Sequence, residues 1–200
     1  MQNLFIYIID TIFPPSEHLK RVRQLNQPHV TNLYAPHTFE DITALSSFHN
    51  PDIHALIHEA KFHANTHAHV LLSALLMHHL KEHPLTYDYI IPIPLSPARY
   101  RARGYNQVYE ILHHTSIPQK NHMLSTMKRV RDTRPQTELA RNERISNMRK
   151  AFIIKQPQQI VGKHIVLLDD VTTTGATLHA AKAALLLHHP ASVTCIALAH

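Results

Sequence analysis

The stretch between residues 164 and 198 constrains the fold of this 200-residue chain more than any other part. An apolar run, His164–Leu168, is followed by two acids and a threonine-rich turn. An alanine- and leucine-rich segment, about 176–189, comes next, and a second apolar run, Ser192–Leu198, closes the stretch. A strand, a helix and a strand at this spacing form a βαβ unit, which joins parallel strands of one sheet. The pattern therefore predicts an α/β fold with an open, mostly parallel sheet flanked by helices.

The remaining chain predicts further elements of such a fold. Apolar residues at helical spacing over 52–82 predict two helices with a break near 64–66. Short apolar runs and flanking prolines predict the other elements: strands at 89–93, within 121–130 and at 152–154, and a helix at 105–114. We expect a short amphipathic helix at 2–13, loops and short strands over 16–50, and a basic loop at 95–103.

The turn after the apolar run His164–Leu168 has the composition of a phosphate-binding loop. In an open α/β sheet the ligand site lies beyond the carboxyl ends of the strands. A helix N-terminus presents unpaired N–H groups there, threonine hydroxyls add donors, and a glycine admits an anion close to the backbone. We predict that a phosphate is bound by Thr172, Thr173, Thr174, Gly175, Ala176 and Thr177.

Two adjacent carboxyl groups, Asp169 and Asp170, precede this loop. Carboxylates repel a phosphate unless they bind ligand hydroxyls or a divalent cation, and ribose hydroxyls with Mg²⁺ nearby meet both conditions. The alternative is that the acids cap the helix and the threonines fill a turn, although a single Asp or Ser would suffice for that. The P-loop of nucleotide-hydrolysing proteins is excluded here because GxxxxGK[ST] is absent.

This loop resembles the phosphoribosyl pyrophosphate (PRPP) signature of type I phosphoribosyltransferases. Three further stretches resemble motifs of the ComF/GntX family, which is associated with DNA uptake in competent bacteria. They are Leu56-Ile57-His58 with Lys61-Phe62, then Ile91–Leu95 with Arg103-Gly104-Tyr105-Asn106-Gln107, and the stretch from Arg131 through Thr133, Gln136, Leu139, Arg144 and Asn147 to Phe152. The resemblance covers about residues 52–200.

The resemblance implies a type I phosphoribosyltransferase-like fold with a small N-terminal hood, and a PRPP site at the loop. It implies Mg²⁺ brought by the ligand, near Asp169 and Asp170, with no direct protein ligands. It places segment 95–107 beside the pyrophosphate and 129–144 in a flexible loop that closes over PRPP. The implied catalytic residues are Asp169, Asp170 and Arg131, and the implied pyrophosphate-side residues are Arg99, Arg103 and Gln136.

The net charge of +6 is concentrated in two stretches. Residues 99–109 carry +3 and residues 128–150 carry +5, so the rest of the chain is slightly acidic. Such stretches suit a phosphorylated ligand or a nucleic-acid backbone, although solvated basic surfaces are an alternative. Single-strand binding favours aromatic residues among the basic ones, and these occur only in the first stretch, as Tyr100, Tyr105 and Tyr109. The sequence therefore favours direct DNA binding less as the main activity.

The N-terminal region 1–50 departs from the family, whose members usually open with a four-cysteine zinc module. This chain has a single cysteine, Cys195. His18, His29 and His37 remain in the region, but irregular spacing without a thiolate makes a poor structural zinc site. The pairs His54/His58 and His63/His67 have helical i,i+4 spacing, yet a composition of 20 histidines explains them more simply. We expect no zinc, and a phosphoribosyltransferase-like domain over 51–200.

Three functions follow from these patterns. The first is an enzyme that transfers a phosphoribosyl group from PRPP to an unknown acceptor during DNA uptake. The second is a non-catalytic adaptor that senses PRPP or a nucleotide and works with DNA-uptake or recombination proteins. The third is a binder of single-stranded DNA. The start of the chain lacks a basic leader and carries Asp10, and no apolar run reaches about 18 residues, so we expect a cytoplasmic protein without membrane insertion.

Overall fold

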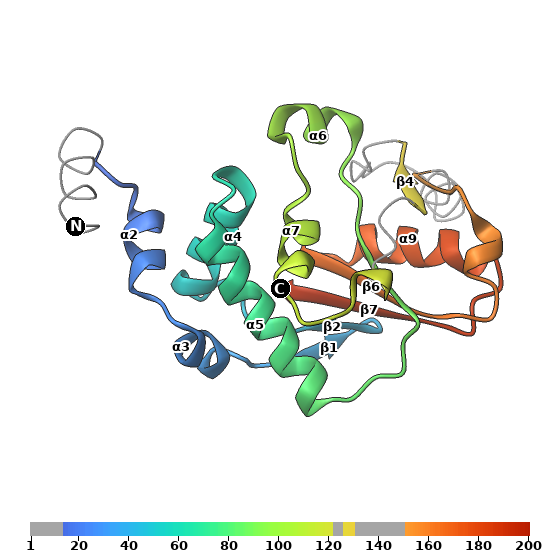
Figure 1. Ribbon diagram of the computed structural model, residues 1–200, viewed down its shortest axis with the longest axis horizontal. Coiled ribbons are helices and arrows are strands. Elements are labelled where there is room, and N and C mark those ends of the chain that lie inside the picture. Colours follow the sequence, from blue (N-terminus) through green and yellow to red (C-terminus); the bar gives the residue numbers. More distant parts are fainter. Residues whose placement is uncertain (1–13, 122–125, 131–150) are drawn as a thin grey trace.

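The computed structural model describes residues 14–121, 126–130 and 151–200. The helix expected at 2–13, and the predicted site residues Arg131 and Gln136, lie outside the described residues. Within them the main sheet has five strands in the order β1-β2-β7-β6-β3 (Figure 1). The strands are β1 (His37–Phe39), β2 (Ile42–Ala44), β7 (Ser192–Ala199), β6 (His164–Val171) and β3 (Tyr89–Pro92).

The sheet is mostly parallel, as the sequence predicts. Strand β6 pairs in parallel with β3 on one side and with β7 on the other, and β7 pairs in parallel with β2. Strand β1 is antiparallel to β2 at the edge. A central parallel strand is covered on both faces, which is why β6 begins as a continuous apolar run rather than an alternating one. Parallel pairing also brings the carboxyl ends of β3, β6 and β7 to one edge of the sheet.

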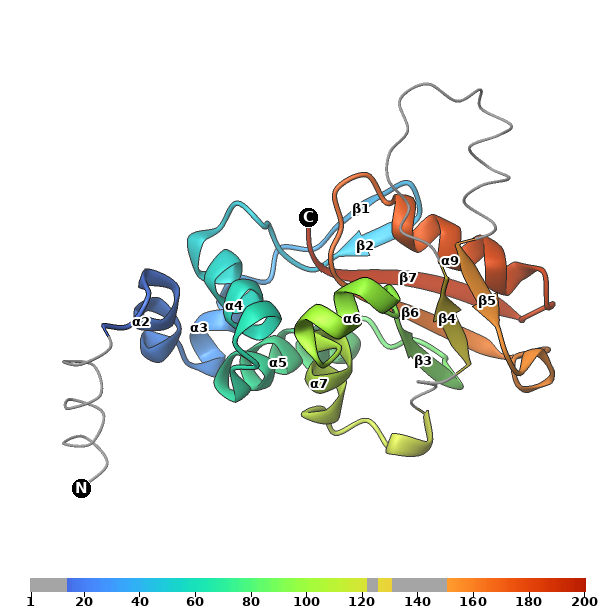
Figure 2. The same cartoon turned by 90° about the horizontal axis from the view of Figure 1, so that it is seen from above.

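The sheet separates two apolar clusters. On one face, Val166 and Leu168 of β6 pack with helices α4 (Pro51–Phe62), α5 (Thr66–Glu82) and α7 (Gln107–His113). On the other face, Ile165 and Leu167 pack with helix α9 (Ala176–Leu186). Figure 2 shows α9 on one side of β6 and β7 and α7 on the other. The alternation along β6 thus assigns its side chains in turn to the two layers.

The two helices expected within 52–82 are present, and the chain breaks where predicted. The Asn50 side chain accepts hydrogen bonds from the N–H groups of Asp52 and Ile53 and caps α4, with Pro51 in its first turn. Helix α5 begins after a second asparagine cap, Asn65. Between the helices Ala64 has a positive φ of 48°, which ends the first helical path.

Three helices lie where the sequence predicts loops: α2 (Glu17–Gln24), α3 (Gln27–Asn32) and α6 (Pro97–Arg103). Each is short and mostly polar, so it lacks the long apolar stripe by which amphipathic helices are recognised. Local capping explains them: the Ser16, Asn26 and Ser96 side chains each accept a hydrogen bond from a first-turn N–H. Strands β1 and β2 also come from residues before 51, so this region contributes to the main sheet.

Two short strands form a separate antiparallel pair, β4 (Met127–Arg129) with β5 (Phe152–Ile154), next to α9. Short 3₁₀ turns occupy Gln119–Asn121 and Pro157–Gln159. Strand β6 is longer than the apolar run that predicts it, because it continues through Asp169 and Asp170 to Val171. Of the helices formed by the described residues, none has the length and apolar content needed to cross a membrane.

Candidate functional site

The acidic pair lies inside β6, and its two side chains belong to opposite faces of the sheet. Asp169 follows Ile165 and Leu167, which face α9, whereas Asp170 follows Val166 and Leu168, which face the α4–α5–α7 layer. Successive strand residues alternate in this way, so two adjacent carboxyl groups on a strand do not share one direction. The two acids therefore have different surroundings.

Asp170 is buried and held by side chains from two helices. Its Oδ2 accepts a hydrogen bond from Gln107 Nε2 of α7 and lies 3.1 Å from Lys61 Nζ of α4. Its Oδ1 accepts the backbone N–H of Val171 at 2.7 Å. Gln107 Oε1 in turn accepts a hydrogen bond from the Arg103 guanidinium. Arg103, Gln107, Asp170 and Lys61 thus form one chain of polar contacts, which we call the Asp170 network.

Asp169 has a different protonation state from an ordinary aspartate. Desolvation, followed by the neighbouring Asp170 carboxyl, raises the pKa of Asp169 to about 8. The positive charges of Lys61 and Arg129 act in the other direction. At pH 7 a group with this pKa is about nine-tenths protonated, so it both donates and accepts hydrogen bonds. A neutral carboxyl also repels a nearby phosphate less than a carboxylate does.

The loop after β6 is folded tightly against the first turn of α9. The Thr172 side chain is buried, and its Oγ1 accepts the N–H of Gly175 at 3.2 Å, while Thr172 N–H donates to Ala199 of β7 at 3.0 Å. Thr173 and Thr174 are exposed. Gly175 precedes the helix with a φ of 70°. The loop therefore presents its threonines at the helix N-terminus, beyond the carboxyl end of β6.

Gly175 is fixed by space as well as by conformation. A Cβ at this position would lie 2.6 Å from Cδ1 of Ile42 in β2 and 3.1 Å from His179 of α9. The positive φ alone favours glycine. Residue 175 is thus pressed between α9 and the β1–β2 hairpin, so the position of the loop depends on a strand from the first 50 residues.

The β1–β2 turn is bonded to α9 by charged side chains. His179 Nε2 lies 2.9 Å from the carbonyl of Glu40 and 3.1 Å from Asp41 Oδ1, and Lys182 Nζ contacts Asp41 Oδ2 at 2.5 Å. These contacts lower the pKa of Asp41, with the Lys182 hydrogen bond the largest cause. The helix that begins at the threonine loop is thereby held at its second turn by the hairpin.

The segment between β3 and α7 carries the Arg-Gly-Tyr-Asn-Gln motif. Gly104 ends α6 with a φ of 84°. Asn106 caps α7 by accepting the N–H of Val108, and its Nδ2 donates to the carbonyl of Ile93 at 2.9 Å. Tyr105 donates its hydroxyl to the Ala60 carbonyl of α4 and accepts the N–H of Ala64, both at 2.8 Å. The motif therefore joins β3, α4 and α7 and orients Gln107 toward Asp170.

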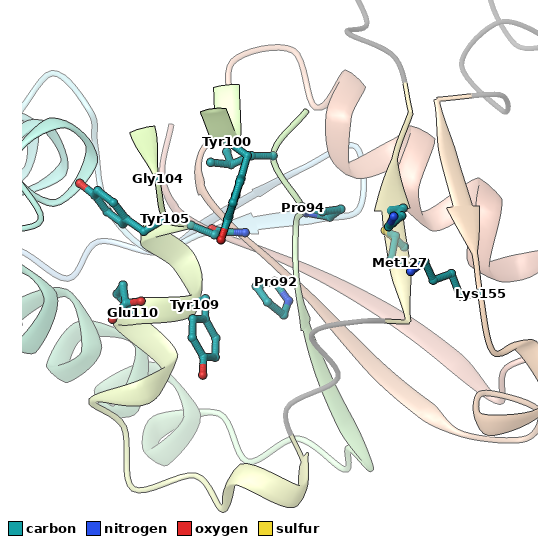
Figure 3. A pocket seen from close by; sticks show the side chains of 12 residues that line it. Pro92, Pro94, Tyr100, Gly104, Tyr105, Tyr109, Glu110, Met127 and Lys155 are labelled. Atoms are coloured by element: carbon teal, nitrogen blue, oxygen red, sulfur yellow. The ribbon is translucent and has the colours of Figure 1, made fainter. Parts of the chain in front are cut away.

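A cavity of about 530 Å³ opens beside this motif, at the carboxyl end of β3. Figure 3 shows Tyr100 and Tyr109 on one side of it and Met127 and Lys155 on the other, with the Tyr105 ring turned away toward α4. The lining residues are Pro92, Pro94, Leu95, Tyr100, Gly104, Tyr105, Asn106, Tyr109, Glu110, Met127, Lys128 and Lys155. The cavity thus combines aromatic surface with two lysines.

The structure brings some predicted site residues together and separates others. Arg103 reaches Asp170 through Gln107, as described, and burial lowers the pKa of its guanidinium. Arg99 is exposed on α6. The predicted phosphate loop, from Thr172 to Thr177, is not among the residues that line the cavity. The cavity and the loop are separate features at the carboxyl ends of neighbouring strands.

Two contacts of the site were not foreseen. The sequence assigns no role to Gln107 or Lys61, whereas both contact Asp170. Arg129 is buried in β4, stacks at 5.7 Å on the Phe152 ring and acts on Asp169 from the α9 side. Gln107 and Lys61 belong to the motif strings and Arg129 does not, but only the fold brings the three residues close to the same two carboxyl groups.

Comparison with known proteins decides the family. No family model matches the chain. The chain is 31% identical to the DNA utilization protein YhgH of Salmonella typhimurium over 169 residues. The match covers 80% of this chain and 71% of that protein. The chain is 35% identical over 95 residues to competence protein F of Haemophilus influenzae, covering 45% of this chain and 40% of that one. This chain belongs to the ComF family.

The chain is also similar to a second competence protein and, distantly, to one solved structure. Competence protein ComFC of Bacillus subtilis is 30% identical over 106 residues, which cover 53% of this chain and 41% of that protein. Among solved structures, the allosteric regulatory enzyme of purine biosynthesis is similar over 72% of this chain and 30% of that one, with a TM-score of 0.46 and 14% identity. That likeness is distant and says nothing of activity.

Proposed function

We propose that this ComF-family protein binds PRPP together with Mg²⁺ at the Thr172–Thr177 loop and transfers its phosphoribosyl group to an acceptor. We place this activity in the cytoplasm and in DNA uptake, because the relatives are named for DNA utilization and for competence. The main support for the proposal is the threonine loop at the N-terminus of α9. This loop is formed around Gly175, which has a positive φ, and it lies beyond the carboxyl end of β6. This is the place and the chemistry of a phosphate monoester site.

The acidic pair suits ribose hydroxyls better than it suits a metal ion. Both oxygens of Asp170 already accept hydrogen bonds from Gln107 and Val171, and Lys61 lies against one of them. Asp169 is mostly protonated at pH 7, and a neutral carboxyl is a poor ligand for a hard divalent cation. In the proposal Mg²⁺ therefore enters on the pyrophosphate of the ligand, without direct protein ligands.

The proposed reaction breaks the bond between ribose C1 and the pyrophosphate oxygen, and the acceptor nucleophile forms the new bond to C1. The electron pair of the broken bond leaves with pyrophosphate, so negative charge grows on that group. Arginines stabilise such charge when they lie nearby. Arg99 on α6 is the exposed described arginine assigned to this role, and Arg131 and Gln136 remain assigned to it by the family resemblance.

The second candidate function is binding of a nucleotide or single-stranded DNA without catalysis, as a sensor or adaptor for DNA-uptake or recombination proteins. The cavity beside α7 favours it, because Tyr100 and Tyr109 offer aromatic surface and Lys128 and Lys155 offer positive charge. The two lysines repel each other, and this lowers the pKa of Lys155. A phosphate between them would relieve that repulsion.

Calorimetry tests the first candidate. We expect wild-type protein to bind PRPP in the presence of Mg²⁺, and Thr174→Val to weaken this binding at least tenfold, since it removes an exposed hydroxyl from the loop. Thr86→Val is the matched control, because Thr86 is equally exposed but lies in the loop before β3. Absence of PRPP binding by wild-type protein, or equal affinity in the Thr174 variant, would overturn the loop assignment.

Catalysis is then tested by pyrophosphate release from PRPP across a panel of bases and amines. Release that depends on one acceptor identifies the transferase. Binding of PRPP without release from any acceptor favours the sensor. Binding of single-stranded DNA that falls steeply with salt, and that is lost in a Lys128→Ala/Lys155→Ala variant, favours the DNA-binding candidate.

A further inference from the structure

A group of imidazoles and one carboxyl lies away from the threonine loop, where α2 packs against α4. Figures 1 and 2 both show these helices side by side. Ser16, at the start of α2, donates a hydrogen bond to Glu59 of α4, and the His18 ring lies 4.2 Å from that of His58, centroid to centroid. His63 follows directly after the last residue of α4. We call His58, Glu59 and His63 the α4 triad.

Glu59 is buried with weak compensation for its charge. Its side chain is only 2% exposed. It accepts long hydrogen bonds from the Ser16 hydroxyl at 3.3 Å and from the Asn65 amide at 3.4 Å. Its ion-pair contacts are with imidazoles, His58 Nδ1 at 3.8 Å and His63 Nε2 at 3.9 Å, which is beyond hydrogen-bond distance. A buried carboxylate is costly unless it is paired or bound to a metal.

His58 also lacks a partner that a bound ion would supply. Its Nδ1 is buried, and it is the side-chain polar atom without a hydrogen-bond partner among the described residues. A buried polar group of this kind calls for a partner, either an ion or a water. One potential ligand atom from each member of the α4 triad lies within 4.8 Å of the others. Two independent features, an under-compensated carboxyl and an orphaned imidazole nitrogen, therefore face one small space.

We propose that the α4 triad binds a divalent transition-metal ion, with Zn²⁺ the best fit, through His58, Glu59 and His63. Two imidazoles and one carboxylate suit zinc and its neighbours in the first transition series better than they suit Mg²⁺ or Ca²⁺, which prefer oxygen ligands alone. This site differs from the cysteine module of other family members, and it departs from the expectation of no zinc drawn from the sequence.

The proposal has a structural consequence for the triad. Zinc–ligand distances of about 2.0–2.2 Å place ligand atoms roughly 3.3 Å apart, so the ion draws the three atoms closer together. Glu59 gains a cation, and His58 Nδ1 gains a partner. The ion would fix α2 to α4 through the Ser16–Glu59 contact.

Cobalt titration tests the proposal, because Co²⁺ reports its ligands by visible absorption. The experiment uses the full chain without an added histidine tag and adds Co²⁺, then Zn²⁺ as competitor. We expect one tight equivalent in wild-type protein, displaced by Zn²⁺. His63→Ala and His58→Ala should each weaken binding at least tenfold and change the Co²⁺ spectrum. His49→Ala, an exposed histidine outside the triad, should leave both unchanged.

The chain's 20 histidines make the controls decisive. His63 is exposed and lies after the end of its helix, so its alanine variant should fold, which circular dichroism checks. Tight binding that persists in both triad variants, or that is lost equally in His49→Ala, would overturn the proposal. Absence of a tight equivalent in folded wild-type protein would overturn it as well.

Discussion

Gly175 shows how a single residue sets the geometry of the threonine loop. Its φ of 70° lies in the left-handed region, and its missing Cβ makes room for Ile42 and His179. Gly162 has nearly the same φ, 68°, but a Cβ there would meet nothing within 4 Å. The two positions therefore share one constraint and differ in the other, which makes them a natural pair for comparison.

Replacing each glycine by alanine separates the two constraints. Gly162→Ala should lower the free energy of unfolding by about 1–2 kcal/mol, the cost of a left-handed conformation with a Cβ. Gly175→Ala should lose about 1–3 kcal/mol more, because the added methyl forces Ile42 and the hairpin to move. Urea denaturation monitored by circular dichroism gives both values. Equal losses in the two variants would mean that the contact with Ile42 places no constraint on the loop.

For single residues, the sequence predicts which residues belong to the site better than it predicts where their side chains point. The acids, the threonines and Gly175 were recognisable from their order along the chain. The separate surroundings of Asp169 and Asp170 were not, because a loop was expected where β6 continues, and alternation applies only inside a strand. The contact between Lys61 and Asp170 joins positions 109 residues apart, so no local pattern reports it.

Among the elements, helix α4 contributes residues both to the α4 triad and to the Asp170 network. Its last turns carry His58 and Glu59 of the α4 triad on the side of α2, and Lys61 on the side of β6. Lys61 is 25% exposed and Asp170 is 6% exposed, so their ion pair is only partly screened by water. Lys61 therefore compensates a buried charge, unlike the lysines of the surface pairs.

Lys61→Met should cost about 2 kcal/mol of stability, less than the loss expected when a fully buried pair is broken. The reason is the Asp170 carboxylate, which keeps Gln107 but loses its cation. Lys20→Met is the control, since the Lys20–Glu17 pair is exposed and should cost less than about 1 kcal/mol. Urea denaturation measures both.

A double variant decides whether the ion pair is the cause. Lys61→Met combined with Asp170→Asn should be more stable than the sum of the two single losses predicts, because the orphaned charge is gone. Additive losses would show that Lys61 stabilises α4 by packing of its aliphatic stem instead.

The elements themselves were predicted in proportion to their apolar content. The two helices within 51–82 and strands β3, β5, β6 and β7 follow from runs that the core requires. Helices α2, α3 and α6 were not predicted because α2 and α3 each bury one apolar residue and α6 buries none, and their caps are visible only after the helix is assumed. Ser96, Pro97 and Gly104 together carried a start and stop signal for α6 that the basic composition of the segment obscured.

The whole molecule has its single thiol in the middle of the sheet. Cys195 is fully buried in β7, opposite Leu167 of β6 and Ile42 of β2. Burial raises the pKa of this thiol to about 12, so the reactive thiolate is scarce at neutral pH. Its side chain lies in the apolar cluster that α9 covers, so α9 must leave the sheet before a reagent reaches the sulfur atom.

Alkylation of Cys195 should therefore report global unfolding, in which α9 leaves the sheet. With iodoacetamide at pH 8, native protein should react at least about a thousandfold more slowly than protein in urea, in line with ordinary global stability. Mass spectrometry follows the single added group. Labelling of native protein within minutes, at a rate near that of the unfolded chain, would mean that α9 leaves the sheet in a local opening.

Because side chains alternate along β6, the surroundings of each acid depend on its position in the strand. One strand supplies both layers: Ile165 and Leu167 pack on the side of α9, whereas Val166 and Leu168 pack on the other side. A single inserted residue before Asp169 would keep every charge and every residue type, yet it would exchange the two carboxyl groups between Lys61 and Arg129. An insertion of two residues would return each carboxyl group to its own side of the sheet.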